Sequence, residues 1–205
     1  MNETGRVEAF SDGVFAIAIT LLILDVKVPA SVGPGNLGGV LLEEWPMFLA
    51  FLTSFFTIGV MWMNHHRLFT IIGAVDDALV GLNLLLLLGI TWIPFPTALL
   101  ATHLRTTGND RTAALIYAST FFVMAIFFQI LWHYATHTAG VIPTEKEEHA
   151  RHITRQYMWG PLFYVVAIVL AIFSGTACLI WSLLLAIYFA LPPRVVARRP
   201  RSMTT

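Results

Sequence analysis

The chain has 205 residues, of which 57% are hydrophobic and only 12% are charged, and its formal net charge at pH 7 is zero. Its mean hydropathy is +0.75. This is more apolar surface than one water-soluble core can bury, so the sequence predicts an integral membrane protein. The zero net charge argues against a nucleic-acid partner, because no basic surplus is left to neutralise phosphates.

Apolar runs long enough to cross roughly 30 Å of hydrocarbon predict the transmembrane helices. They lie near residues 8–28, 45–63, 78–101, 111–134, 159–174 and 176–192. The expected fold class is therefore an all-α integral membrane protein, with one six-helix transmembrane domain over residues 1–205. Six spans place both termini on the same side of the membrane.

Three shorter features complete this expected topology. Residues 29–39 are rich in glycine and proline and predict a flexible extracellular loop. Pro94 and Pro96 predict a kink in the third span, because proline cannot donate a helix hydrogen bond. The polar residues 144–158 predict a short cytoplasmic helix before the fifth span.

The distribution of basic residues predicts the orientation of the chain. Nine fall on the side of the termini: Arg6, Arg67, Lys146, Arg151, Arg155, Arg194, Arg198, Arg199 and Arg201. Three fall on the opposite side: Lys27, Arg105 and Arg111. We therefore expect both termini in the cytoplasm, with the basic tail against anionic membrane lipid.

The first span is apolar on every face except at its cytoplasmic end. At about 100° per residue, Ile17, Leu21 and Leu24 share one stripe, and Thr20 lies at its margin. Asp12 lies on nearly the opposite side of the helix, so this carboxylate does not share a face with the stripe.

A carboxylate inside a membrane helix needs partners. An ionised aspartate at the centre of such a helix costs about 2.5 to 3.5 kcal/mol on insertion scales, and Asp12 lies one turn inside. The end of the second span reaches the same depth. The expected partners of Asp12 are Asn64, His65, His66 and Arg67, and we interpret this polar group as a support for the helix rather than as an ion-binding site.

The polar entry of the first span also carries a motif. Residues 6–12, RVEAFSD, match R-x-x-x-F-S-D, which resembles the signature of the endolysosomal-type potassium channel family and its prokaryotic relatives. The resemblance continues in Trp62, His65 and His66 after the second span. Residues 83–100 are similar to the third helix of that family, so the resemblance covers about the first half of the chain.

This resemblance implies a function and an assembly. In that family the first helix lines the conduction path and its bulky apolar residues narrow it, at positions that correspond to Ile17, Leu21 and Leu24. Animal members resemble two fused six-helix repeats, whereas this chain has one, which implies a homotetramer around a central pore. The implied protein is a moderately selective potassium channel with a hydrophobic gate, which passes K⁺ and other monovalent cations across a bacterial-type plasma membrane.

The candidate site therefore has two parts. The pore-lining and selectivity residues are Ile17, Thr20, Leu21 and Leu24. The supporting polar network is Arg6, Phe10, Ser11, Asp12, Trp62, Asn64, His65 and His66.

Other classes of protein fit the residues less well. A secondary transporter usually shows inverted repeats and broken helices around a midplane site, whereas this chain shows one kinked helix and no visible repeat. A structural membrane module is a further alternative. No nucleophile with a nearby base and no HExxH pattern predicts an enzyme. The histidine pairs 133/137 and 149/152 share helix faces but lack a third ligand, so we expect no metal site and no cofactor.

Overall fold

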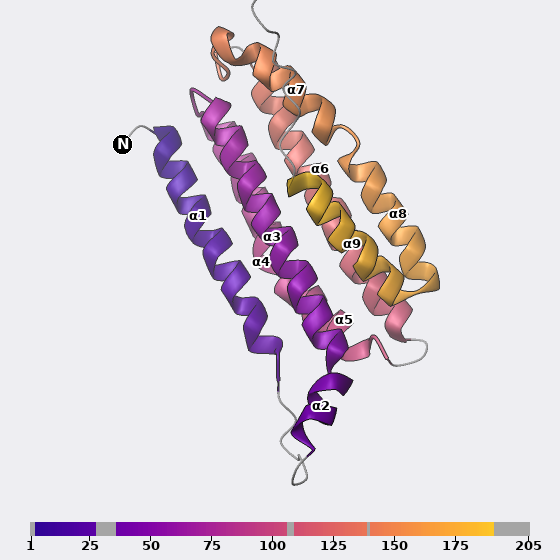
Figure 1. Ribbon diagram of the computed structural model, residues 1–205. Coiled ribbons are helices and arrows are strands. Elements are labelled where there is room, and N and C mark those ends of the chain that lie inside the picture. The colour runs from indigo at the N-terminus through magenta and orange to yellow at the C-terminus, as the bar shows by residue number, and fades with distance from the viewer. Residues whose placement is uncertain (1–2, 28–35, 106–108, 139, 191–205) are drawn as a thin grey trace, which may run out of the picture.

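The apolar runs of the sequence form long helices that run side by side (Figure 1). The computed structural model describes residues 3–27, 36–105, 109–138 and 140–190, and the regular structure within these ranges is helical. Five of the described helical stretches are long and apolar enough to cross a membrane, and a sixth, Gly175–Ala190, is apolar but shorter. The chain is thus a multi-pass membrane protein.

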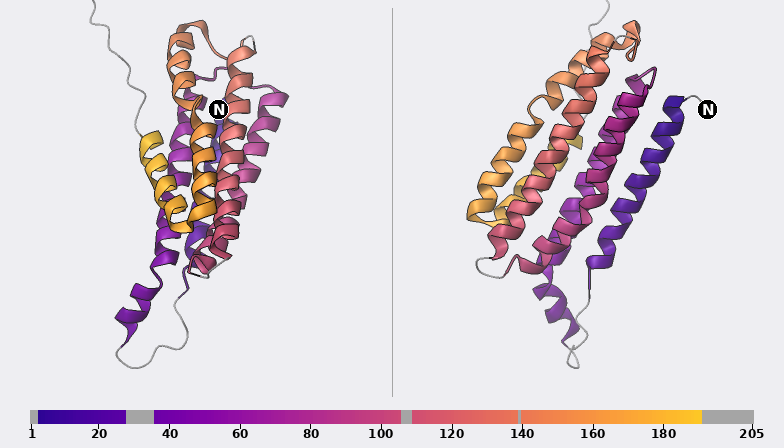
Figure 2. Two further views of the ribbon diagram at one scale, coloured as in Figure 1. Left: turned by 90° about the vertical axis from the view of Figure 1, so that its right-hand side faces the viewer. Right: turned by 180° about the vertical axis from the view of Figure 1, so that it is seen from behind.

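The first helix, α1 (Glu3–Leu21), lies at one edge of the bundle and packs against α3 (Trp45–Ile71) and α4 (Asp77–Trp92) (Figures 1 and 2). It continues as the 3₁₀ turn η1 (Leu22–Asp25). Its buried residues recur at helical spacing and define the face that meets α3 and α4. They are Thr4, Ser11, Phe15, Ala18 and, on the 3₁₀ turn, Leu22.

The second span is longer than its sequence indicates. The predicted span ends near residue 63 because polar residues follow, whereas α3 continues to Ile71. The reason is that Asn64 and His65 are buried and both have hydrogen-bond partners, Arg67 on the same helix and Asn83 on α4 respectively, so these polar side chains do not end the helix.

The third span is broken at Ile93, where Pro94 and Pro96 predict a kink. The helix α4 ends at Trp92, and α5 (Pro94–His103) begins with a proline, which has no N–H to donate to the preceding turn. The helix ladder resumes at Thr97, whose N–H donates to the Ile93 carbonyl at 3.2 Å and whose hydroxyl donates to the same carbonyl at 2.9 Å.

A buried polar cluster ties this break to the rest of the bundle. Thr97 Oγ1 lies 2.8 Å from Ser54 Oγ, and the same serine oxygen lies 3.1 Å from the hydroxyl of Tyr117. The three residues come from α5, α3 and α6 (Asn109–His137) and are all buried.

The C-terminal half packs around α6. After it come the 3₁₀ turn η2 (Thr144–Lys146), α7 (Glu147–Tyr157), α8 (Gly160–Phe173) and α9 (Gly175–Ala190). The helices α8 and α9 form a hairpin through Ser174, and both contact α6, while α9 also packs on α3. A β-carbon on Gly175 would lie 2.7 Å from Leu104 Cδ1, so a larger residue at this turn would force the Leu104 side chain to move.

The first loop and the C-terminal end of the chain differ from the expected topology or lie outside the described residues. Part of the expected loop at residues 29–39 is helical, because α2 (Leu37–Glu43) begins within it, while residues 28–35 lie outside the described chain. The last two residues of the expected sixth span and the basic tail also lie outside it.

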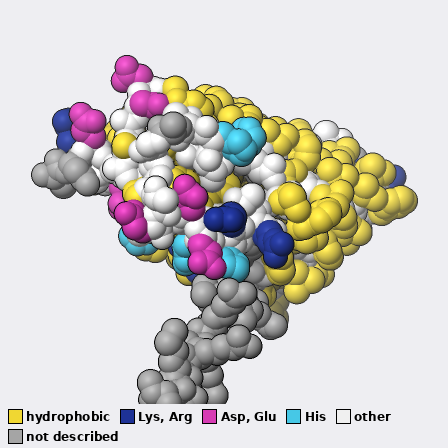
Figure 3. Space-filling model, turned by 90° about the horizontal axis from the view of Figure 1, so that it is seen from above, with side chains coloured by type: hydrophobic (Ala, Val, Ile, Leu, Met, Phe, Trp, Pro, Cys, Tyr) yellow, Lys and Arg dark blue, Asp and Glu magenta, His cyan; other side chains and the backbone are white. Residues whose placement is uncertain are grey.

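Charged and histidine side chains gather at the end of the bundle that carries the start of α1 and the helix α7 (Figure 3). Apolar side chains cover much of the sides in the same view. This distribution matches a polar membrane surface at one end of an apolar bundle.

Candidate functional site

The stripe predicted on the first helix points away from the protein's own core. The side chains of Ile17, Leu21 and Leu24 are 60%, 41% and 67% exposed, respectively. On the opposite face, Phe15 and Ala18 are almost fully buried. The helix α1 therefore buries one face against α3 and α4 and exposes the apolar stripe on the other face.

The geometry at the end of α1 keeps this stripe straight. Because residues 22–25 form a 3₁₀ turn with about three residues per turn, Leu24 lies directly beyond Leu21. Thr20 is exposed beside them, and its hydroxyl donates to the carbonyls of Ala16 and Ile17, both at 2.9 Å. The hydroxyl proton is thus used within the helix, and the oxygen keeps its lone pairs as hydrogen-bond acceptors.

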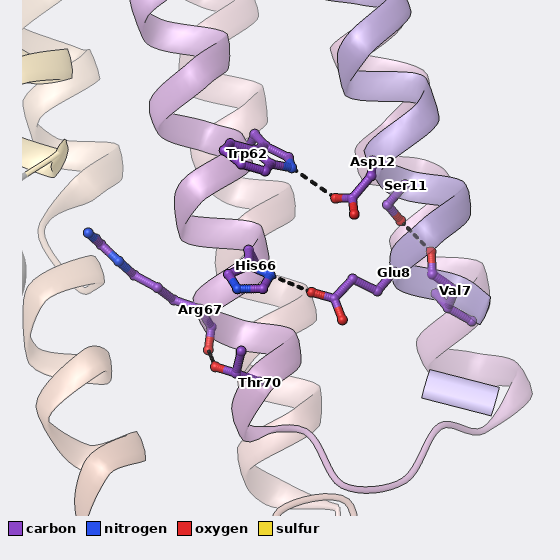
Figure 4. Close-up of polar contacts among 8 residues, drawn as sticks. All are labelled: Val7, Glu8, Ser11, Asp12, Trp62, His66, Arg67 and Thr70. Atoms are coloured by element: carbon purple, nitrogen blue, oxygen red, sulfur yellow. Dashed lines mark hydrogen bonds and ion pairs between the residues drawn. The ribbon is translucent and has the colours of Figure 1, made fainter. Parts of the chain in front are cut away.

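Asp12 is held by a residue that differs from the four expected partners. The indole Nε1 of Trp62 donates to Asp12 Oδ1 at 2.8 Å, linking α1 to α3 (Figure 4). The expectation that Asn64, His65, His66 and Arg67 hold Asp12 is wrong, because each of these side chains bonds elsewhere. An indole can serve because its N–H is a donor on an otherwise apolar ring.

One turn closer to the helix start, Glu8 makes a second link between the same two helices. Its Oε1 lies 2.6 Å from Nδ1 of His66, and the imidazole of His66 stacks on the indole of Trp62. The histidine side chain is 55% exposed, so water screens this pair.

A buried chain of hydrogen bonds makes the third link and includes α4. Asn83 Nδ2 donates to Ser11 Oγ at 2.9 Å, and Ser11 Oγ donates to the Val7 carbonyl at 2.8 Å. Asn83 Oδ1 must therefore accept from Nε2 of His65, which lies 2.9 Å away. All three side chains, Ser11, His65 and Asn83, are at most 1% exposed.

This assignment fixes the tautomer of His65. With its proton on Nε2, the ring carries a lone pair on Nδ1, and this buried atom has no hydrogen-bond partner among the described residues. The ring lies between two aromatic side chains: its centroid is 4.4 Å from that of Phe69 and 5.4 Å from that of Phe15. Packing against these two rings and the hydrogen bond to Asn83 together hold the imidazole in place.

The remaining expected supports lie outside this contact. Arg67 points away from α1 (Figure 4). Its Nη1 donates to Asn64 Oδ1 on the same helix α3 at 2.9 Å, and its Nη2 donates to the Ala190 carbonyl of α9 at 3.2 Å. Arg6 and Phe10 are exposed on α1. The structure brings Ser11, Asp12, Trp62, His65 and His66 together, but not Arg6, Phe10 or Asn64.

Sequence reasoning missed Asn83 and Glu8 as members of this network. A signal for Asn83 was available, because it is a lone amide in the run LNLLLLLG, and a polar residue within a membrane helix suggests a specific role. The described residues contain no cluster of three or more His, Cys, Asp or Glu side chains that could hold a metal ion.

The fold and this network define a multi-pass helical membrane protein in which polar side chains fix the first helix to the bundle and leave its apolar stripe outside. Residues 6–94 match the family model described as the endosomal/lysosomal potassium channel TMEM175. The chain is 46% identical over 190 residues to a potassium channel of Streptomyces collinus, covering 92% of each chain. It is 48% identical over 193 residues to a potassium channel of Chamaesiphon minutus, covering 93% of this chain and 95% of that relative.

A solved structure extends this similarity to three dimensions. The crystal structure of a lysosomal potassium-selective channel TMEM175 homolog from Chamaesiphon minutus superimposes with a TM-score of 0.83 at 48% identity, over 93% of this chain and 97% of that one. This chain belongs to the TMEM175 family of potassium channels. It is therefore an ion channel rather than an enzyme.

Proposed function

We propose that this potassium channel is a homotetramer in which four copies of α1 surround the conduction path. In this assembly the stripe of Ile17, Leu21 and Leu24 narrows the path, and Thr20 lies beside it. The observation that carries the proposal is that this stripe is exposed in the single chain while the opposite face of α1 is buried against α3 and α4.

The four chains are needed because one helix face cannot enclose a path. A closed ring of identical subunits gives each copy of α1 the same environment on the axis. The polar contacts support this arrangement, since Asp12 and Ser11 are used on the side of α1 that faces the chain's own bundle. These residues act as supports that hold the stripe toward the axis.

The chemistry of the stripe accounts for moderate selectivity. A ring of Ile17 side chains offers a cation no ligand, so an ion passing it sheds part of its hydration shell. Sodium is smaller than potassium and holds its water more tightly, so the same constriction is a higher barrier for sodium. The hydroxyl oxygen of Thr20 supplies a partial replacement for the lost water. The same rings exclude water when they close, which makes them a hydrophobic gate.

The chain has both termini in the cytoplasm of a bacterial-type cell and spans its plasma membrane. The nine-to-three distribution of basic residues supports this orientation. It places Asp12, Trp62 and His66 in the cytoplasmic half of the membrane and the end of the stripe at Leu24 in the opposite half.

Cysteine accessibility tests the pore assignment. An Ile17→Cys channel in planar bilayers should lose most of its potassium current when a positively charged, membrane-impermeant thiol reagent is added. The matched control is Ile187→Cys, because Ile187 is 56% exposed on α9, away from α1. The native Cys178 is buried and provides a low background.

Two results would contradict the proposal. Equal sensitivity of the two cysteine variants would show that Ile17 is not on the ion path. A stable and active monomer, found by native mass measurement, would remove the ring of four helices altogether.

A further inference from the structure

A small, partly open cavity lies between helices of the bundle, separate from the stripe on α1. It is formed by α3, α6, α8 and α9 together with the end of α7, and its volume is about 60 Å³. Its walls are mainly apolar, and Val60, Met61, Phe128 and Phe189 make up much of them. None of the described residues that line it carries a formal charge.

Tyr164 brings a hydroxyl group to this cavity. Its side chain is only 5% exposed, and its ring packs parallel to that of Phe121, with centroids 6.0 Å apart. In the described part of the chain this hydroxyl makes no hydrogen bond. A buried tyrosine usually places its hydroxyl on a partner, so this one is available to a ligand in the cavity.

Asn64 supplies a second polar group on the α3 side. It is 7% exposed, and its Oδ1 accepts the hydrogen bond from Arg67, but its amide Nδ2 has no partner among the described residues. The bond from Arg67 to the Ala190 carbonyl links α3 to α9 beside the cavity. The cavity thus combines the amide donor of Asn64 and the hydroxyl of Tyr164 with mainly apolar walls, while Gln129 and Thr57 in its lining donate to backbone carbonyls.

We infer that this cavity binds a small neutral amphipathic molecule with one hydroxyl group, of the short-chain alcohol class. The hydroxyl of such a ligand satisfies Tyr164 and Asn64, and its alkyl part contacts the aromatic walls. An ion would lose its hydration without meeting an opposite charge.

The size of the cavity limits the ligand. An engineered cavity of about 150 Å³ holds benzene, so about 60 Å³ encloses about two or three non-hydrogen atoms, as in ethanol. So few atoms limit the dissociation constant to about the millimolar range. This inference does not depend on the proposed pore.

Crystallography with a heavy-atom alcohol locates the site. Crystals of the full chain soaked in 2-bromoethanol should show an anomalous bromine peak between Tyr164 and Phe189. Two variants should lower its height. Tyr164→Phe removes the hydroxyl and keeps the ring. Gly160→Ala adds one methyl group, whose carbon would lie 3.7 Å from Phe189 Cζ, an ordinary contact that the fold tolerates.

Saturation-transfer NMR with ethanol tests binding in solution, using the full chain in deuterated detergent. The transfer should fall at least about twofold in Tyr164→Phe and in Gly160→Ala. It should be unchanged in the control Tyr188→Phe, because Tyr188 is 44% exposed on α9 and does not line the cavity. The inference would be overturned by bromine peaks found only outside the cavity, or by equal transfer in the unmodified chain and all three variants. Either result would indicate that the cavity holds only water.

Discussion

The indole nitrogen of Trp62 donates a 2.8 Å hydrogen bond to the carboxylate of Asp12, across fifty positions of sequence. This bond joins α1 to α3 at the point where the first membrane helix carries its acidic residue. It gives a carboxylate within a membrane helix a hydrogen-bond donor on the side of α1 away from the apolar stripe. The contact makes the last residue of the segment RVEAFSD a hydrogen-bonded link between α1 and α3.

The first prediction concerns this contact. Trp62→Phe and Asp12→Asn should each destabilise the assembled channel, because each weakens a hydrogen bond to a charged group. Hydrogen bonds to charged groups contribute about 1.5 to 3 kcal/mol to stability. Because this bond is partly exposed, we expect each variant to lose about 1 kcal/mol. Thermal unfolding of the two single variants and the double variant in detergent measures the coupling. If the two effects add without coupling, the bond does not hold α1.

The second prediction compares two links between α1 and its neighbours. Asn83→Leu should cost about 1 to 3 kcal/mol, because it leaves the Nε2 proton of buried His65 without an acceptor. Glu8→Gln should cost at most about 1 kcal/mol, because its partner His66 is exposed and screened. The fraction of intact assembly on heating, measured for both variants, distinguishes them. A larger loss from Glu8→Gln would reverse our ranking of the two links.

The third prediction concerns selectivity. Ile17→Asn should raise single-channel conductance and bring sodium permeability closer to that of potassium, because a polar ring lowers the dehydration barrier. Reversal potentials under potassium and sodium gradients measure this change. Ile19, on the same helix, cannot serve as a lipid-facing control because it is only partly exposed and packs against α3. A β-carbon added to Gly59 of α3 would lie 3.9 Å from Ile19 Cδ1. Ile187→Asn on α9 is the matched control and should leave both quantities unchanged.

The fourth prediction concerns acid stability at the loop between α3 and α4. Asp76 caps α4 by accepting from the Leu79 N–H at 2.8 Å, and the hydroxyl of Tyr134 donates to its other oxygen at 2.6 Å. The bond from Tyr134 and then the bond from Leu79 lower the pKa of Asp76 below its ordinary value of 3.8. A lowered pKa favours the folded state above pH 3.8, and this stabilisation is lost as the pH falls through the folded-state pKa.

Tyr134→Phe should therefore lower thermal stability at pH 6 and reduce the further loss of stability over the acid interval below about pH 4, the ordinary pKa of an aspartate. Unfolding curves at several pH values measure both effects. Asp76→Asn keeps a capping side chain and removes the charge, so its stability should depend less on pH in this interval. An unchanged acid profile in Tyr134→Phe would show that the tyrosine hydroxyl does not hold the carboxylate.

The sequence by itself determined the membrane class, the number and approximate position of the apolar runs, and the stripe of Ile17, Leu21 and Leu24. These follow from length, hydropathy and a period of about 3.6 residues, which are local properties of the chain. The break at Ile93 was likewise predictable, because proline acts on its own helix turn.

Only the tertiary structure decided which polar side chains meet. Asp12 pairs with Trp62 rather than with the residues two to five positions further along, because the rotation and depth of α3 beside α1 select one side chain of several candidates. Asn83 joins Ser11 to His65 only because three helices converge there. Which side chains pair depends on packing between helices that are far apart in sequence. Rotating one helix by a single residue, about 100°, would bring a different side chain to face its neighbour.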